Sequence, residues 1–159
     1  MRVSDIMSTP VFTIGADESA PAAWQKMRFR RTRHLVVTDA EGRVTGLISA
    51  SDLGGKLGEA VRATYRVRDL MTEKLVVVRP DTTVREAANL MRGHNINCLP
   101  VFNGHDRLKG IVTVIDLLEL LGRGVERPTK ATARPVLKDR GVVPRQAMAR
   151  DRGRRAVQR

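Results

Sequence analysis

Two segments of the chain place a hydroxyl side chain three residues before a carboxylate. The first runs from Gly46 to Asp52 and the second from Gly110 to Asp116, and each reads glycine, two apolar residues, serine or threonine, two variable residues and aspartate. A carboxylate just after a strand can accept both hydrogen bonds of a ribose diol, and neighbouring hydroxyls and helix N-terminal amides favour phosphate oxygens. The pattern therefore indicates a nucleotide-like ligand, although a carboxylate at this position can also serve only as a helix cap.

The two segments belong to a longer duplication. Shifting the chain by 64 positions aligns residues 3–53 with residues 67–117 without a gap, and 13 of these 51 pairs are identical. Average residue usage would produce about three identical pairs. Such self-similarity predicts one structural unit that occurs twice.

Each copy opens with a strand and a helix. Apolar residues rich in β-branched types at 11–14 and at 75–78 predict a short strand in each copy. A helix then begins near Ser19 in the first copy, where the proline two residues later falls in the first turn. In the second copy the helix begins near Thr83, where Glu86 completes a capping box.

Each copy then predicts a β-hairpin and a closing helix. The expected strands are 35–37 and 43–48 in the first copy, and 99–102 and 107–112 in the second. The closing helix reaches about Leu121 in the second copy, whereas glycines weaken it in the first copy. We therefore predict an α/β (α+β) fold built of two βαββα repeats.

The composition predicts an aliphatic core and a basic C-terminal region. Of the 159 residues, 42% are hydrophobic and only 3% aromatic, and the single cysteine excludes an internal disulfide. Residues 122–159 contain 12 Lys and Arg and 3 Asp and Glu, a net charge of +9 out of the total of +12. This region contains prolines and no sustained apolar period, so we expect a flexible tail.

The sequence lacks the patterns of secreted and membrane proteins. An acid and a proline interrupt the N-terminal stretch where a signal peptide needs an apolar run. No segment approaches the roughly 18–20 consecutive apolar residues of a membrane span. We therefore predict a cytoplasmic protein without a membrane partner, and, because the three histidines have no ligand-like spacing, no metal site.

A βαββα unit that occurs twice and ends on Gly-h-h-Ser/Thr-x-x-Asp (h, apolar) resembles the cystathionine-β-synthase (CBS) domain family. The Val-x-Asp-Ile/Leu-Met openings and the segments 33–37 and 98–101 match the family as well. The resemblance implies two repeats packed through their sheets with pseudo-two-fold symmetry, in a module that often forms homodimers. The expected organisation is repeat 1 at 1–58, a linker at 59–66, repeat 2 at 67–121 and the basic tail at 122–159.

The family pattern implies two ligand clefts related by the pseudo-symmetry. The residues expected in the first cleft are Ser49, Ser51 and Asp52 for ribose and phosphate, Arg33 and His34 for phosphate, and Thr72, Leu75 and Val76 beside the base. Those expected in the second cleft are Thr113 and Asp116, with Ser8, Val11 and Phe12 near the base.

The two clefts differ in the number of side chains that can bind a phosphate. The second lacks one hydroxyl and two basic side chains, because the positions of Ser51, Arg33 and His34 are taken by Ile115, Asn97 and Cys98. We therefore expect the Asp52 cleft to bind more tightly, and the Asp116 cleft to be empty or to prefer an uncharged ligand. The simpler interpretation of the basic pair is a solvated strand end.

The resemblance implies a regulatory module that is not an enzyme and requires no cofactor. Its expected ligand is AMP, ADP or ATP, with NAD and S-adenosylmethionine as alternatives, and it is expected to signal in trans to an unknown protein partner. Two other functions stay open. One is nucleic-acid binding through residues 122–159, helped by the arginine cluster at 28–33; the other is a purely structural dimerisation module.

Overall fold

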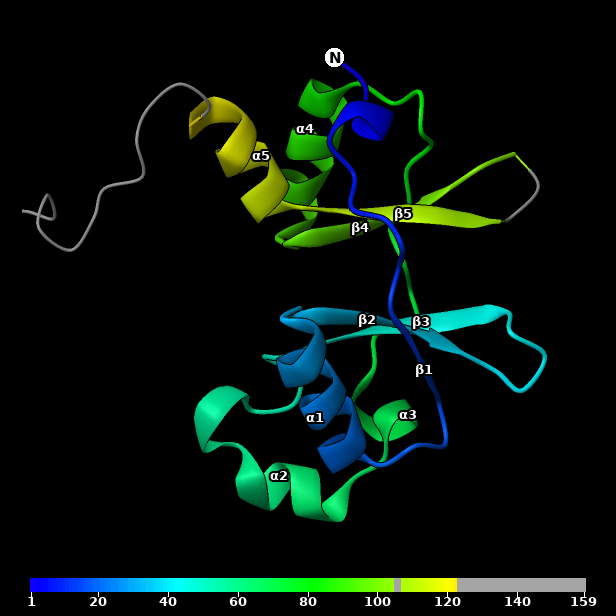
Figure 1. Cartoon of the computed structure of the whole chain (residues 1–159), viewed down its shortest axis with the longest axis vertical. Helices are drawn as coiled ribbons and strands as arrows, with labels where there is room; N and C mark the ends of the chain where they lie inside the picture. The colour runs from blue at the N-terminus through cyan, green and yellow to red at the C-terminus, as the bar shows by residue number, and fades with distance from the viewer. Residues whose placement is uncertain (105–106, 123–159) are drawn as a thin grey trace, which may run out of the picture. The chain divides into compact units, whose positions relative to one another are not determined.

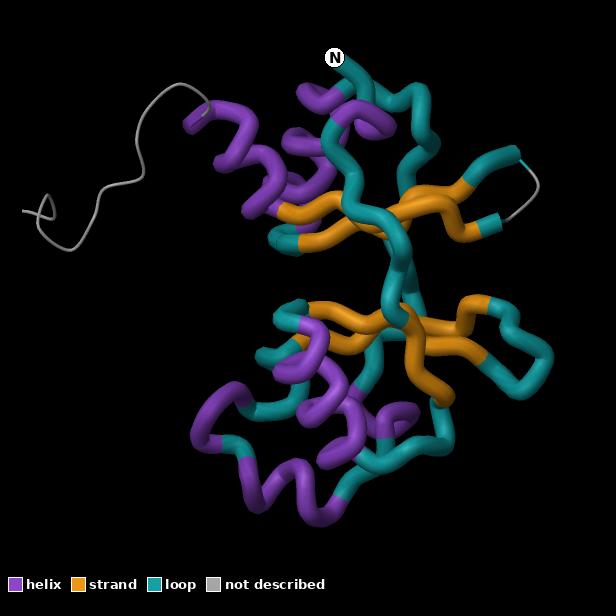
Figure 2. The backbone as a smooth tube through the Cα atoms, viewed as in Figure 1, coloured by secondary structure: helices purple, strands orange, loops and turns teal. Residues whose placement is uncertain are grey.

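The computed structural model describes residues 1–104 and 107–122, all within one compact unit. The elements in chain order are η1 (Val3–Asp5), β1 (Thr13–Gly15), α1 (Ala20–Arg30), β2 (His34–Thr38), β3 (Val44–Ser49), η2 (Gly55–Leu57), α2 (Glu59–Thr64), α3 (Val67–Leu70), α4 (Val84–His94), β4 (Cys98–Phe102), β5 (Leu108–Thr113) and α5 (Val114–Gly122). They form a mixed α+β fold with two small sheets and helices packed on them, as predicted (Figures 1 and 2). The predicted tail lies, from residue 123 on, outside the described residues.

The hairpins and capped helices agree with the sequence analysis. Strand β2 pairs antiparallel with β3, and β4 pairs antiparallel with β5. The Ser19 hydroxyl accepts a hydrogen bond from the Ala22 amide at 3.3 Å, and α1 begins there. In α4, Thr83 and Glu86 exchange the two hydrogen bonds of the predicted capping box, at 2.9 and 3.2 Å. Within the described residues, no helix is both long and apolar enough to cross a membrane.

The strand predicted at 75–78 is wrong, because a proline in β4 removes a donor that the pairing requires. In repeat 1 the Val36 amide donates to the Phe12 carbonyl at 3.1 Å, and β1 continues parallel to β2. Pro100 occupies the position of Val36 in repeat 2 and has no N–H to donate. Only an isolated bridge between Val78 and Val101 forms, so the second sheet contains two strands and the first contains three.

The connection between the repeats is partly helical. Gly54 and Gly55 have φ values of +75° and +58°, which interrupt the chain after the Asp52 turn. The short elements η2 and α2 follow and lead into α3. The expected weakening of the closing helix in repeat 1 is therefore confirmed, and α2 is an additional helix within the predicted connection.

The two hydrophobic cores exchange their opening turns. Val3 of η1 is buried in the core formed by α4, β4 and β5, and its amide donates to the Thr82 carbonyl at 2.8 Å. Val67 of α3 is buried in the core formed by α1, β2 and β3, and its amide donates to the Glu18 carbonyl at 3.0 Å. Each repeat therefore completes its core with a segment of the other.

The glycine that opens each motif makes room for a segment that crosses from one repeat to the other. We call these the crossing segments; they contain residues 7–8 and 71–72. Thr72 pairs with Leu47 at the edge of β3, and Ser8 pairs with Ile111 at the edge of β5. A Cβ atom on Gly46 would lie 2.9 Å from the Thr72 carbonyl oxygen and 2.8 Å from the Met71 sulfur. Close backbone approach thus explains Gly46, whereas at Gly110 an added Cβ would meet the side chain of Met7.

Candidate functional site

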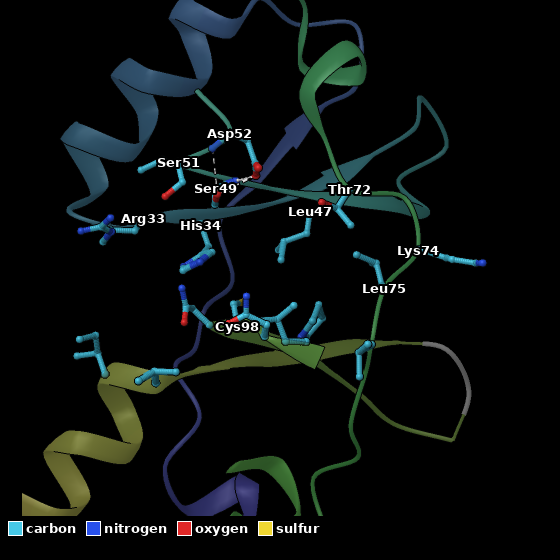
Figure 3. A pocket seen from close by; sticks show the side chains of 18 residues that line it. Arg33, His34, Leu47, Ser49, Ser51, Asp52, Thr72, Lys74, Leu75 and Cys98 are labelled. Atoms are coloured by element: carbon cyan, nitrogen blue, oxygen red, sulfur yellow. Dashed lines mark hydrogen bonds between the residues drawn. The ribbon is translucent and has the colours of Figure 1, made fainter. Parts of the chain in front are cut away.

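A cavity of about 470 Å³ lies between the two repeats, in the size range of small-molecule sites. Its walls come from β2, β3 and the turn after β3, from the crossing segment after α3, and from the start of β4 and of α5 (Figure 3). The lining residues are Arg33, His34, Leu47, Ser49, Ala50, Ser51, Asp52, Thr72, Lys74, Leu75, Val76, Asn95, Ile96, Asn97, Cys98, Pro100, Val114 and Ile115. All eight residues predicted for the first cleft are among them.

One of the two carboxylate oxygens of Asp52 accepts hydrogen bonds within its own turn. Its Oδ2 atom accepts hydrogen bonds from the Ser49 amide and the Ser49 hydroxyl, both at 2.7 Å, and the Asp52 amide donates to the Ser49 Oγ at 3.2 Å. This is the geometry of a cap, although turn residues rather than a continuous helix follow. No hydrogen bond from the described residues reaches Oδ1. The capping role therefore leaves one carboxylate oxygen free for a ligand.

Asp116 makes the same cap but is more fully engaged. Its Oδ2 atom accepts from the Thr113 amide at 2.7 Å and from the Thr113 hydroxyl at 2.8 Å, and α5 begins here. The Ser8 hydroxyl donates to Oδ1 at 3.4 Å. Both oxygens of Asp116 therefore have partners within the protein, whereas Asp52 has a free one.

His34 is the basic side chain that reaches deepest into the cavity. It lies opposite Ser49 in the β2–β3 pair and points toward Cys98 across the cavity (Figure 3). Burial lowers the pKa of His34 below its ordinary value, and the charge of Arg33 lowers it further, while Asp52 opposes both effects. The lowered pKa favours the neutral form of His34 at pH 7, and Arg33 is exposed beside it.

Apolar side chains form the wall opposite these polar groups. Leu47 and Leu75 point into the cavity, whereas Lys74 points away from it (Figure 3). Val76, Ile96 and Pro100 line it as well. A flat, apolar group such as a purine can pack between such side chains.

The residues of repeat 2 that were not predicted for this cavity come from the start of β4 and the segment before it, and from the start of α5. Asn97 and Cys98 line it together with Arg33 and His34, whose repeat positions they share. The 64-residue shift pairs these positions but does not reveal that they face each other across one cavity. Leu47, two residues before Ser49 on β3, was the one missed lining residue with a local signal, because alternate residues share a face of a strand.

The residues predicted for the second cleft do not belong to the cavity described above. Ser8, Thr113 and Asp116 form one hydrogen-bonded group, but none of the five predicted residues lines the cavity described above. The Phe12 ring is covered by the Arg30 guanidinium at 5.0 Å from its centroid. One face of the Phe12 ring is therefore in contact with a cation.

Cys98 is held in its protonated form. The side chain is buried, and this burial raises the pKa of the Cys98 thiol, with a smaller contribution from the Asp116 charge. A thiol in this state is a poor nucleophile. Cys98 is thus a buried residue that also lines the cavity.

Comparison with protein families identifies both copies. The CBS domain family matches residues 3–57 and 67–123, which confirms the predicted tandem pair. A CBS domain-containing protein of Dictyostelium discoideum is 32% identical over 136 residues, covering 78% of this chain and 93% of that protein. Other curated relatives are much longer: the chain spans 26% of a homoserine O-acetyltransferase of Methanohalophilus mahii and 18% of the magnesium transporter MgtE of Thermus thermophilus.

Two solved structures resemble the chain and contain adenosyl compounds. The CBS domain pair of protein MJ0100, in complex with 5′-methylthioadenosine and S-adenosyl-L-methionine, is 27% identical with a TM-score of 0.70, covering 77% of this chain and 96% of that chain. CBSX2 in complex with AMP is 26% identical with a TM-score of 0.63, covering 76% and 95%.

Proposed function

Because the chain belongs to the CBS domain family, we propose that it is a regulatory module that binds an adenine nucleotide or adenosyl ligand and signals to a partner in trans. The observation that carries this proposal is the free Oδ1 atom of Asp52 in a cavity with one basic and one apolar wall. The ligands of the two related solved structures support the adenosyl part of the proposal.

Each wall of the cavity has a role in the proposed complex. Asp52 accepts hydrogen bonds from the ribose diol, and the Ser51 hydroxyl can donate to a ribose or phosphate oxygen. The Ser49 hydroxyl, whose proton is donated to Asp52 Oδ2, can still accept from a ribose hydroxyl. Arg33 and His34 bind the phosphate, while Leu75 and Val76 hold the base. These steps are binding alone, and no catalytic residue is assigned.

The basic pair favours a ligand with a phosphate over one without. The Arg33 guanidinium attracts the negative charge of AMP, ADP or ATP, and the His34 imidazole beside it can donate a hydrogen bond to phosphate. S-adenosylmethionine instead carries a cationic sulfonium next to its ribose. We therefore rank adenine nucleotides first, with NAD and S-adenosylmethionine next.

A ligand panel tests the proposal. Thermal unfolding is measured with AMP, ADP, ATP, NAD, S-adenosylmethionine and 5′-methylthioadenosine, because a ligand that binds only the folded state raises Tm. We expect AMP at about 100 times its Kd to stabilise the fold by about 2.7 kcal/mol. GMP and inorganic phosphate are the controls. If none of the adenosyl compounds raises Tm above these controls, the proposal is wrong.

We also propose that the module forms a homodimer that uses α5. Ile115, Leu118 and Leu121 are 58%, 55% and 79% exposed and recur every three residues along this helix. A helix face with three exposed aliphatic side chains is typical of a surface that packs against another protein. The inner residues of the same helix, Val114 and Leu117, pack against the core of repeat 2.

A further inference from the structure

Arg62 of α2 is a buried charge without an anionic partner. It is 8% exposed and is the one charged residue that is buried among the described residues. Its Nη1 donates to the Leu53 carbonyl at 3.0 Å and to the Gly55 carbonyl at 2.6 Å, and its guanidinium lies 4.3 Å from the Trp24 ring centroid. None of the ion pairs between described residues includes Arg62. A buried charge is stabilised most strongly when an opposite charge pairs with it.

A second cavity, of about 760 Å³, lies beside this guanidinium between α1 and α2. We call it the α1–α2 cavity; its lining residues are Pro21, Trp24, Gln25, Arg28, Lys56, Glu59, Arg62 and Ala63. Three cations and one carboxylate give it a net charge of 3 − 1 = +2. Arg28 and Lys56 are exposed, and neither makes an ion pair with any described residue. The cavity is therefore positively charged and its cations are available.

Comparison of the repeats shows that the fold does not require the aromatic wall. Ala88 stands in repeat 2 where Trp24 stands in repeat 1. The aromatic wall is thus particular to the first repeat. If Arg62 served only to hold the carbonyls of the turn, Arg28 and Lys56 would not be needed beside the same cavity.

We propose that the α1–α2 cavity binds a small anion that carries phosphate groups. Arg62 is already oriented by two carbonyls and the Trp24 ring, so little side-chain entropy is lost when an anion reaches it. Arg28 from α1 and Lys56 from the connection complete the site with two more donors. The site is separate from the Asp52 cavity and does not depend on its proposed ligand.

The bound anion is linked to the turn that carries Asp52. Arg62 holds the carbonyl of Leu53, the residue directly after Asp52, and the carbonyl of Gly55. An anion that fixes Arg62 therefore stabilises this turn. We expect occupancy of the α1–α2 cavity to slow hydrogen exchange in residues 51–58.

Trp24 is the single tryptophan of the chain, so its fluorescence reports on this cavity alone. Inorganic pyrophosphate is titrated into the full chain at constant ionic strength, and we expect a saturable change. The double variant Arg28→Ala/Lys56→Ala should weaken this binding at least about tenfold, because two charge-assisted hydrogen bonds are lost. The matched control is Arg92→Ala/Lys109→Ala, which removes the repeat equivalent of Arg28 and another exposed lysine, and it should bind within about twofold of wild type.

Three results would overturn the proposal: an unchanged Trp24 signal, a response that sulfate reproduces at equal ionic strength, or equal weakening in the two double variants. The titration is repeated in Asp52→Ala, where pyrophosphate affinity should persist whether or not the adenosyl proposal holds. A parallel titration with AMP distinguishes a nucleotide phosphate from a free polyphosphate as the source of the anion. Binding without slower exchange in residues 51–58 would disprove the link to the turn.

Discussion

At the scale of single residues, the two duplicated aspartates differ in how many of their carboxylate oxygens accept hydrogen bonds within the protein. Both cap the turn or helix that follows them, so the capping interpretation is correct for each. It is incomplete for Asp52, whose Oδ1 atom accepts no hydrogen bond from the described residues, while Ser8 reaches Oδ1 of Asp116. Identical motifs can therefore differ in the chemistry that they leave available.

Asp52→Ala and Asp116→Ala should differ in their effect on AMP binding. We expect Asp52→Ala to weaken it at least about tenfold, the effect of losing hydrogen bonds to a charged group. Asp116→Ala should change it less than about threefold, although each loses roughly 1 kcal/mol of stability with its cap. Isothermal titration calorimetry measures both affinities, and equal losses would contradict the expected asymmetry.

His34 should make the stability of the free protein depend on pH. Its pKa in the folded state is lowered below 6.5, so between the two values the unfolded chain binds more protons than the folded one. The contribution of His34 to the free energy of unfolding is therefore fully present above pH 6.5. It is lost as the pH decreases toward the folded pKa, by at most about 1.4 kcal/mol per pH unit.

Urea denaturation of wild type and His34→Gln across this range measures the effect. The variant should lose this component of the pH dependence while retaining that of the carboxylates. A variant whose stability falls as steeply as wild type below pH 6.5 would show that another group is responsible.

At the scale of elements, single backbone features decide which segments pair. Repeat 2 does not form the ladder that β1 forms in repeat 1, because Pro100 offers no amide to the Val76 carbonyl. Gly46 and Gly110 allow the crossing segments to reach the edges of β3 and β5. The proline was visible in the sequence, but its consequence depended on which edge of β4 faced the crossing segment.

Gly46→Ala should destabilise the fold by about 1–3 kcal/mol, the typical effect of overpacking a close contact. The added Cβ would meet the Thr72 carbonyl and the Met71 sulfur at under 3.0 Å. The matched control is Gly93→Ala in α4, where an added Cβ meets nothing within 4 Å and should stabilise the helix by up to about 1 kcal/mol. Chemical denaturation of both variants gives the comparison, and an equal or stabilising effect at Gly46 would refute the close-approach explanation.

At the scale of the whole molecule, the exchange of opening turns makes the two repeats one cooperative unit. Each core loses a fully buried valine if the other repeat is removed. The cavity has the same property, because its walls come from both repeats. A ligand that binds there contacts residues on both sides of the pseudo-symmetry and stabilises their association.

Leu118→Glu should weaken the proposed homodimer at least about tenfold, because it places a charge on the exposed face of α5. The matched control is Leu57→Glu, which makes the same change at a residue that is 97% exposed outside that helix. Sedimentation velocity over a range of concentrations measures the two dissociation constants. A monomeric wild type, or equal effects of the two variants, would contradict a dimer through α5.

Local patterns in the chain predicted most of the helices and strands, and the family. Cap residues placed the starts of α1 and α4, and apolar segments on either side of turn residues placed the hairpins. The 64-residue repeat with its Gly-h-h-Ser/Thr-x-x-Asp ending indicated the CBS pair. These features depend on interactions between residues a few positions apart, or on comparison of the chain with itself. The free energy that selects them is therefore encoded within short segments.

Tertiary contacts decided what the duplicated residues can bind. Which carboxylate oxygen stays free depends on whether Ser8, 108 positions away, reaches it. That Asn97 and Cys98 share a cavity with Arg33 and His34 depends on how the two sheets face each other, and the burial that lowers the pKa of His34 arises from the same packing. The two repeats have similar local sequence patterns. The difference in which of their groups can bind a ligand therefore comes from neighbours far away in the sequence, which no periodicity encodes.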